Sequence, residues 1–167
     1  MKKIPDYKRA RETALDVLEN NQIYEPPVNA AKLARIYGFR VYEAAFEGEY
    51  AESVAGFIEV EKNKITVNEK DSIARRNFTI AHELGHYLLE HDLSRDYSVL
   101  MRNQYHQIPK TTIEQEANCF AAHLLVPTVF LSEFLDEGYS DEELANIFGV
   151  SKEVIRFRRP YANAYKT

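Results

Sequence analysis

The chain has 167 residues, 45% of them hydrophobic, and a formal net charge of −5 at pH 7. This size and apolar content suit one compact domain, and the negative charge supplies no basic field that would attract nucleic acid or an anionic membrane. No apolar run approaches the roughly 20 residues that span a bilayer, and the first residues lack the apolar stretch of a secretory signal. The single cysteine, Cys119, cannot form an intrachain disulfide. We therefore expect a cytoplasmic protein without membrane association.

The first part of the chain predicts two helices and then strands. Apolar residues recur with helical spacing over 6–20 and over 28–37. Strand patterns follow over 39–44, 54–60 and 65–68. The last two strands flank a polar turn, so we expect them to form an antiparallel hairpin.

The middle of the chain predicts two long helices separated by an irregular segment. The first helix spans 75–91, and Asp71 or Ser72 can cap its start. The second spans 112–125. The segment 91–110 between them has no clear periodicity, and a loop of that length is usually functional.

The first of these helices carries the motif H-E-x-x-H, from His82 to His86. Histidines four apart on a helix lie on the same face, one turn from each other, and can bind one zinc ion together. Glu83 is rotated by about 100° from His82 and so lies beside the metal, where it can take a proton from a bound water. This arrangement is the core of a zinc protease.

The surroundings of the motif favour metal binding over two ordinary core histidines. Apolar residues flank it on nearly every side, so the helix must be largely buried. Burying two histidines and a carboxylate is costly unless they are paired or bound to a metal. A glycine within a helix costs about 1 kcal/mol relative to alanine, so Gly85 indicates close approach by another element.

A catalytic zinc site needs a third protein ligand. The extended motif H-E-x-x-H-x-x-G-x-x-H is excluded, because Leu89 and Asp92 stand at its glycine and third histidine positions. His91 is one residue out of place, and we expect it to be solvated at the helix end.

Glu114 is the candidate third ligand, because it shares a face of the second long helix with alanines and leucines. Asn118, one turn further on, could hydrogen-bond a metal-bound histidine. Glu116 is rotated by about 200° and should face solvent. Glu114 could alternatively form a capping box with Thr111, although Thr112 and Gln115 fit one equally well. His106 and His123 are weaker candidates for the ligand, expected at the surface.

Two blocks of this chain resemble the ImmA/IrrE family of small zinc metallopeptidases. The first block runs from Phe78 through the H-E-L-G-H motif, and the second is Glu114-x-x-Ala117-Asn118-x-Phe120-Ala121-Ala122-x-Leu124-Leu125-Val126-Pro127. The resemblance covers roughly 65–127 and implies that His82, His86 and Glu114 bind Zn²⁺ while Glu83 is catalytic. The Glu114 and Asn118 spacing is also similar to that of gluzincins. Val126 stands where the family usually has methionine.

The resemblance also implies a fold and a class of substrate. We expect a small α+β, zincin-like domain that is mostly helical, with a three-stranded antiparallel sheet and a helix-turn-helix-like C-terminal segment. The whole chain, 1–167, would form one domain, with N-terminal helices over 1–38, the sheet and metal helices over 39–127, and C-terminal helices over 128–167. Family members cleave helix-turn-helix repressors of mobile elements or act in stress-response regulation, so the expected partner is a protein substrate of the repressor type.

Two parts of the expected mechanism depend on further residues. A hydrogen-bond donor should stabilise the oxyanion that develops on the substrate carbonyl, and the candidates all lie in the irregular segment: Tyr97, Arg102, Tyr105 and His106. The strand over 65–68 could present an edge along which substrate lies as an added strand.

A DNA-binding regulator with a structural zinc is the alternative function. The segment 141–158 predicts two short helices around Gly149, and the second carries Lys152, Arg156 and Arg158 as a recognition helix would. Direct nucleic-acid binding is the weaker hypothesis, because the rest of the chain is acidic and has no second basic patch. A structural zinc would also be closed by four protein ligands.

Overall fold

The computed structural model describes residues 4–48, 51–93, 100–101 and 111–162. Its helices are α1 (Tyr7–Asn20), α2 (Ala30–Ile36), α3 (Ile73–Leu88), α4 (Thr112–Leu125), α5 (Thr128–Asp136), α6 (Asp141–Phe148) and α7 (Lys152–Ala162). Its strands are β1 (Arg40–Ala44), β2 (Val54–Glu59), β3 (Lys64–Asn68) and β4 (Leu100–Met101), and a 3-10 turn, η1 (Val60–Lys62), joins β2 to β3. The small, mostly helical α+β fold expected from the sequence is confirmed.

Local side-chain caps explain where several helices begin. Asp6 accepts the backbone N–H of Arg9 at the start of α1, at 2.9 Å. Ser72, one of the two expected caps, accepts the N–H of Arg75 at the start of α3, at 3.2 Å. Each cap satisfies a backbone donor that has no partner within its helix.

The sheet corrects one part of the expected fold. Its order is β1-β3-β2-β4, and β1 runs parallel to β3 while β2 runs antiparallel to β3. The expected β2–β3 hairpin is therefore present, but the sheet is mixed, and the two-residue β4 extends it beyond β2. A period-2 pattern identifies a strand without fixing its neighbours, so strand order and direction were not readable from the chain.

β3 lies inside the sheet, because it pairs with β1 on one side and with β2 on the other. The expectation that the strand over 65–68 offers a free edge to substrate is therefore wrong. The same position explains the apolar burial of β3, in which Ile65 and Val67 are at most 1% exposed.

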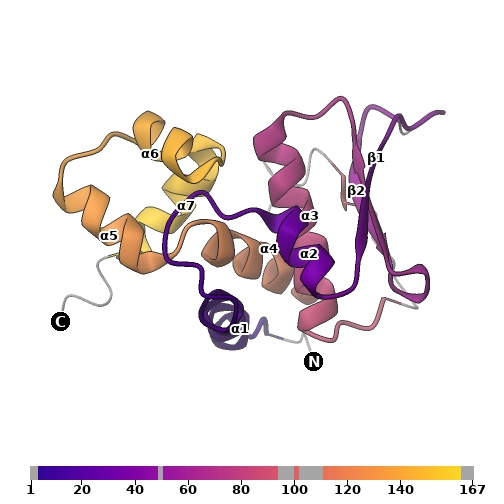
Figure 1. The fold of residues 1–167 in the computed structure, drawn as a ribbon, viewed down its shortest axis with the longest axis horizontal. Coiled ribbons are helices and arrows are strands. Elements are labelled where there is room, and N and C mark those ends of the chain that lie inside the picture. Colours follow the sequence, from indigo (N-terminus) through magenta and orange to yellow (C-terminus); the bar gives the residue numbers. More distant parts are fainter. Residues whose placement is uncertain (1–3, 49–50, 94–99, 102–110, 163–167) are drawn as a thin grey trace.

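α3 is the central helix of the molecule. It packs against β2 and β3 on one side, and against α2 and α4 on others (Figure 1). α4 packs in turn against α1, and α5 and α4 both contact α7. The assignment of the whole chain to a single domain stays a prediction.

α5 has no separate counterpart among the helices that the sequence predicts. Pro127 is its N-cap, and Leu131 is its fully buried residue. Among the described residues, no single helix is long and apolar enough to cross a membrane. The bent pair of α4 and α5 would together be long and apolar enough, judged by length and composition alone.

Candidate metal centre

α3 places the two motif histidines side by side in the interior. The His82 and His86 rings are 4.7 Å apart between centroids, and their Nε2 atoms are 3.0 Å apart. Both residues are at most 2% exposed. The two nitrogens therefore face one point from successive turns of the same helix, as the spacing predicts.

α4 brings Glu114 to that same point. Its Oε2 lies 3.2 Å from His82 Nε2, and its Oε1 lies 3.2 Å from His86 Nε2. Thr111 caps α4 by accepting the N–H of Glu114, while the Glu114 side chain turns toward the histidines. The structure thus brings together the ligand set expected from the sequence.

These three side chains fit a divalent cation. Two ligands of a tetrahedral zinc ion at roughly 2.0–2.1 Å are about 3.3–3.4 Å apart, and the separations of 3.0–3.2 Å here are close to that edge length. Among the described residues, one potential ligand atom from each of these three side chains lies within 4.8 Å of the other two. One carboxylate and two imidazoles leave a position for water or substrate, as catalytic sites require.

Close packing of α3 on α4 makes this approach possible. A Cβ at Gly85 would lie 2.7 Å from Phe120 Cδ1, which is closer than non-bonded carbons approach. Phe120 is fully buried. The close approach expected at Gly85 is therefore present, and α4 is the partner.

Asn118 lies beside the first histidine. Its Oδ1 is 2.8 Å from His82 Nδ1, and an amide oxygen can only accept, so the imidazole donates. In a neutral imidazole this hydrogen bond leaves the lone pair of His82 on Nε2, the nitrogen that faces Glu114 and would bind a cation. The contact is the one expected from the spacing of Asn118 on α4.

The structure corrects the expectation that His91 and Glu116 face solvent. Their side chains are only 4% and 12% exposed, and His91 Nε2 lies 2.8 Å from Glu116 Oε2. The other ring nitrogen, His91 Nδ1, lies 2.9 Å from His86 Nδ1.

Backbone geometry explains both errors. α3 ends at Leu88, and Glu90 adopts a left-handed conformation, φ 55°, which turns His91 back so that its N–H reaches His86 O at 3.0 Å. No glycine marks that turn, so the helix predicted from the sequence ends at residue 91, whereas α3 ends at Leu88. Glu116 is covered because α1 packs on its side of α4, and it accepts the N–H of Asp6 at 2.8 Å.

Glu83 is buried next to the ligand set. It is 1% exposed, and this burial raises its pKa to about 8, with the nearby Glu114 carboxylate adding to the rise. His82 and a backbone hydrogen bond from Ile58 in β2 act in the opposite direction. Its Oε1 is buried without a hydrogen-bond partner among the described residues. A cation beside Glu83 would favour its ionised form.

The His82, His86 and Glu114 side chains are electrostatically coupled. Burial alone would raise the pKa of Glu114, but hydrogen bonds to His82 and His86 hold that pKa far below its ordinary value. Burial lowers the pKa of His86 to about 4, which keeps its imidazole neutral. For His82 the burial effect is outweighed by Glu114, which raises the pKa of this imidazole. A divalent cation would replace the proton that the Glu114 carboxylate otherwise favours on His82.

Of the remaining site candidates, only His123 lies among the described residues, and it does not join the cluster. Tyr97, Arg102, Tyr105 and His106 lie outside the described residues. His123 was expected at the surface, but it is 8% exposed and accepts from Arg158 at 3.2 Å, so that expectation is wrong. It lies on the face of α4 turned away from Glu114, where α7 covers it.

The helix-turn-helix-like segment contains the two expected helices, but of its three expected basic residues only Lys152 and Arg156 are exposed. α6 ends at Gly149 in a left-handed conformation, and α7 follows. Arg158 is fully buried and donates to Val126 O at 3.1 Å and to Thr128 Oγ1 at 2.7 Å. This side chain therefore anchors α7 to the end of α4 and cannot reach DNA.

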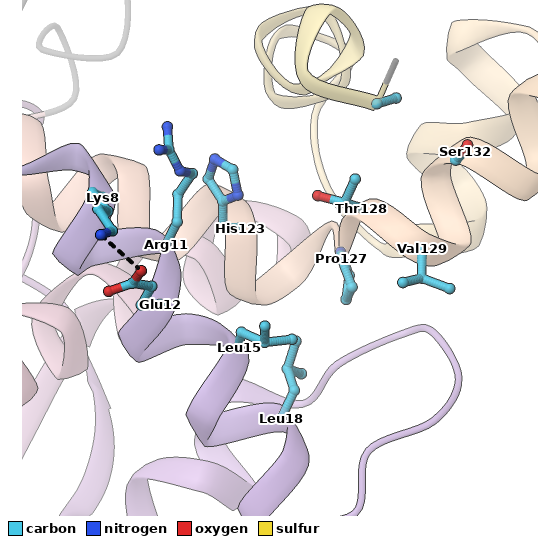
Figure 2. A pocket seen from close by; sticks show the side chains of 11 residues that line it. Lys8, Arg11, Glu12, Leu15, Leu18, His123, Pro127, Thr128, Val129 and Ser132 are labelled. Atoms are coloured by element: carbon cyan, nitrogen blue, oxygen red, sulfur yellow. Dashed lines mark ion pairs between the residues drawn. The ribbon is translucent and has the colours of Figure 1, made fainter. Parts of the chain in front are cut away.

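A cavity of about 610 Å³ lies apart from the metal cluster, between α1, α4 and α5. Figure 2 shows Lys8 and Glu12 on one side, joined as an ion pair, with Thr128 and Val129 across from them. Leu15, Leu18 and Val129 are among its apolar lining residues, and none of its lining residues belongs to the His82, His86 and Glu114 cluster.

Comparison with known proteins identifies relatives of this chain. The profile of the IrrE N-terminal-like domain, peptidase family M78, matches residues 34–159. The metallopeptidase ImmA of Bacillus subtilis (strain 168) is 32% identical over 96 residues, which are 56% of this chain and 53% of that protein.

A Mycobacterium tuberculosis transcriptional regulator has a similar fold, with a TM-score of 0.66 over 90% of this chain and 46% of that one. Its sequence identity is 18%, so the likeness concerns the fold alone. The chain spans about half the length of the proteins that it matches. On the family profile, which covers most of its length, the chain belongs to the peptidase M78 family of IrrE N-terminal-like domains.

Proposed function

We propose that this protein is a zinc-dependent endopeptidase that cleaves a specific regulatory protein in the cytoplasm. The observation that carries the proposal is the convergence of His82, His86 and Glu114 on one point, with the buried Glu83 beside them. Two imidazoles and one carboxylate suit zinc, although manganese or iron can bind such a set when they are more available.

A zinc ion held by these residues would polarise the peptide carbonyl and make water more acidic. The role of the chain is to hold and move protons around that ion. Glu83 would accept a proton from the attacking water and pass it to the leaving amine. The hydrogen bond from Ile58 fixes the carboxyl of Glu83, so one oxygen stays available for this transfer.

The outer edge of β2 is the best surface for the substrate backbone. Within the described residues, β4 pairs with β2 only at Val54 and Gly56, and Ile58 further along contacts Glu83. A substrate segment added as a strand along this part of β2 would pass next to the proposed metal centre. This surface replaces the internal strand β3 as the candidate edge.

The substrate class is part of the proposal. ImmA, which this chain resembles over about half of its length, is a metallopeptidase, and the resemblance of the two sequence blocks to the ImmA/IrrE family implies a substrate of the repressor type. We therefore expect the substrate to be a repressor-type DNA-binding protein of a mobile element or stress-response system, and the enzyme to act as an anti-repressor.

The direct test is to incubate the purified protein with the repressor encoded beside its gene and to read the products by mass spectrometry. Zinc-dependent cleavage at one site, stopped by a chelator, is the expected result. Glu83→Gln should keep zinc and lower the cleavage rate by roughly 10²–10⁴-fold, because it removes the proton acceptor. Glu69→Gln, at an exposed position, is the matched control. Cleavage by Glu83→Gln at the parent rate would refute the role of Glu83.

Direct DNA binding through α6 and α7 is the second candidate, and the contacts of α7 speak against it. Arg158 is buried, and the exposed Arg156 lies 3.5 Å from Asp141 of α6. A salt-dependent gel shift with duplex DNA that a chelator leaves unchanged would favour this function over the protease.

A further inference from the structure

The His91 imidazole connects a proposed metal ligand to a carboxylate on another helix. Its ring centroid is 5.1 Å from that of His86, and its two nitrogens are 2.9 Å from His86 Nδ1 and 2.8 Å from Glu116 Oε2. The chain of contacts therefore runs from Glu116 on α4, through His91, to His86 on α3.

Hydrogen-bond chemistry gives the contacts from Glu116 through His91 to His86 one direction. An ionised carboxylate only accepts, so Nε2 of His91 carries the hydrogen that points at Glu116. A neutral imidazole with its hydrogen on Nε2 accepts at Nδ1, so Nδ1 of His86 must donate to it. A neutral His86 that donates from Nδ1 has its lone pair on Nε2, the atom that faces Glu114 and that would bind a cation in place of a hydrogen.

Glu116 is itself held in place on both sides. Its Oε1 accepts the backbone N–H of Asp6, the residue that caps α1, at 2.8 Å, while its Oε2 accepts from His91. The carboxylate is thus fixed between α1 and α4, and it cannot turn away from His91 without breaking the contact with α1.

The two proposed metal-binding histidines are oriented in different ways by the same helix. Asn118 reaches His82 directly, whereas Glu116, on another side of α4, reaches His86 through His91. We infer that Glu116 and His91 are positioning residues, which set the tautomer and ring orientation of His86 so that its Nε2 can bind the cation. This inference rests on the proposed metallopeptidase function and concerns residues outside the H-E-x-x-H motif and its third ligand.

Zinc affinity, measured by competition with a chromophoric chelator, tests the inference without any activity assay. His91→Ala and Glu116→Ala should each weaken zinc binding by roughly 10–100-fold, as loss of such outer contacts does at other sites. The double variant should lose little more than either single variant, because the two residues act as one chain. Glu116→Gln keeps an acceptor oxygen for His91 and should lose less than Glu116→Ala.

Two further measurements separate positioning from general damage to the fold. Glu69→Gln changes a charge at an exposed position between β3 and α3 and should leave zinc affinity unchanged. In the cobalt-substituted protein, His91→Ala should also shift the visible absorption bands, which respond to ligand geometry, while Glu69→Gln should not.

The imidazole nitrogen NMR spectrum of the parent protein gives an answer even if a variant folds poorly. Hydrogen on Nδ1 of His86 and on Nε2 of His91 in the zinc-loaded protein supports the proposed hydrogen bonds from His86 through His91 to Glu116. Hydrogen on Nδ1 of His91 overturns this inference, as does parent-like zinc affinity in both alanine variants. A parent protein that binds no zinc at all would instead refute the proposed function itself.

Discussion

Gly85 faces the Phe120 ring where α3 packs against α4, and no side chain fits between them. The absence of a Cβ lets the helix that carries Glu114 approach the helix that carries both histidines. At the scale of one residue, the geometry of the proposed metal centre therefore depends on a position that has no functional group.

Gly85→Ala should destabilise the protein by about 1–3 kcal/mol, because overpacking against the buried Phe120 outweighs the better helix propensity of alanine. Urea unfolding measures this loss. Phe120→Leu should restore part of it, so the double variant should be more stable than the sum of the two single changes predicts. Simple additivity would contradict direct contact between the two residues.

At the scale of elements, α7 is fixed to the rest of the molecule by a buried polar contact. Arg158 donates to His123 Nε2 at 3.2 Å, and an arginine always donates, so His123 must stay unprotonated at that atom. Burial, followed by the nearby charges of Arg158 and Arg11, lowers the pKa of His123 to about 3.

His123 should make the stability of the fold sensitive to acid. Between its unfolded pKa of about 6.5 and its folded pKa of about 3, only the unfolded chain binds a proton at this residue, so stability falls as pH falls. His123→Gln keeps an acceptor for Arg158 without titrating. Its free energy of unfolding should drop less than that of the parent between pH 7 and pH 5, by about 2 kcal/mol.

Urea titrations of both proteins at the two pH values, with the same zinc concentration, measure this difference. An equal drop in the parent and in His123→Gln would mean that His123 also accepts a proton in the folded protein, and that its contact with Arg158 opens in acid.

At the scale of the whole molecule, the proposed metal centre joins two helices that are distant in sequence. α3 contributes His82 and His86, and α4 contributes Glu114. A cation bound at this point would couple its own binding to the stability of the fold, because the unfolded chain does not keep these residues together.

Zinc at about 100 times its dissociation constant should add about 2.7 kcal/mol to the stability and raise the midpoint of thermal unfolding by roughly 5–10 °C. Scanning calorimetry with and without a chelator measures this shift. Glu114→Ala should lose most of the shift, whereas Glu69→Gln, at an exposed position, should keep it. A full shift in Glu114→Ala would exclude Glu114 as a ligand.

The sequence alone determined those features that depend on spacing within one helix. The positions of His82, His86 and Glu83 follow from a fixed rotation of about 100° per residue, and the burial of the helix follows from its apolar surroundings. The bounds expected for the second long helix, 112–125, match α4, so the orientation of Glu114 and Asn118 could be predicted as well.

Only the tertiary structure decided which surfaces are covered and which strands pair. The side chains of His91 and Glu116 are largely covered because the chain turns back at Glu90 and because α1 packs on α4, and neither event follows from local periodicity. Arg158 is buried rather than presented to DNA because α7 packs against the end of α4. Strand order was likewise undetermined, since alternation of apolar residues defines a strand's faces and says nothing about its neighbours.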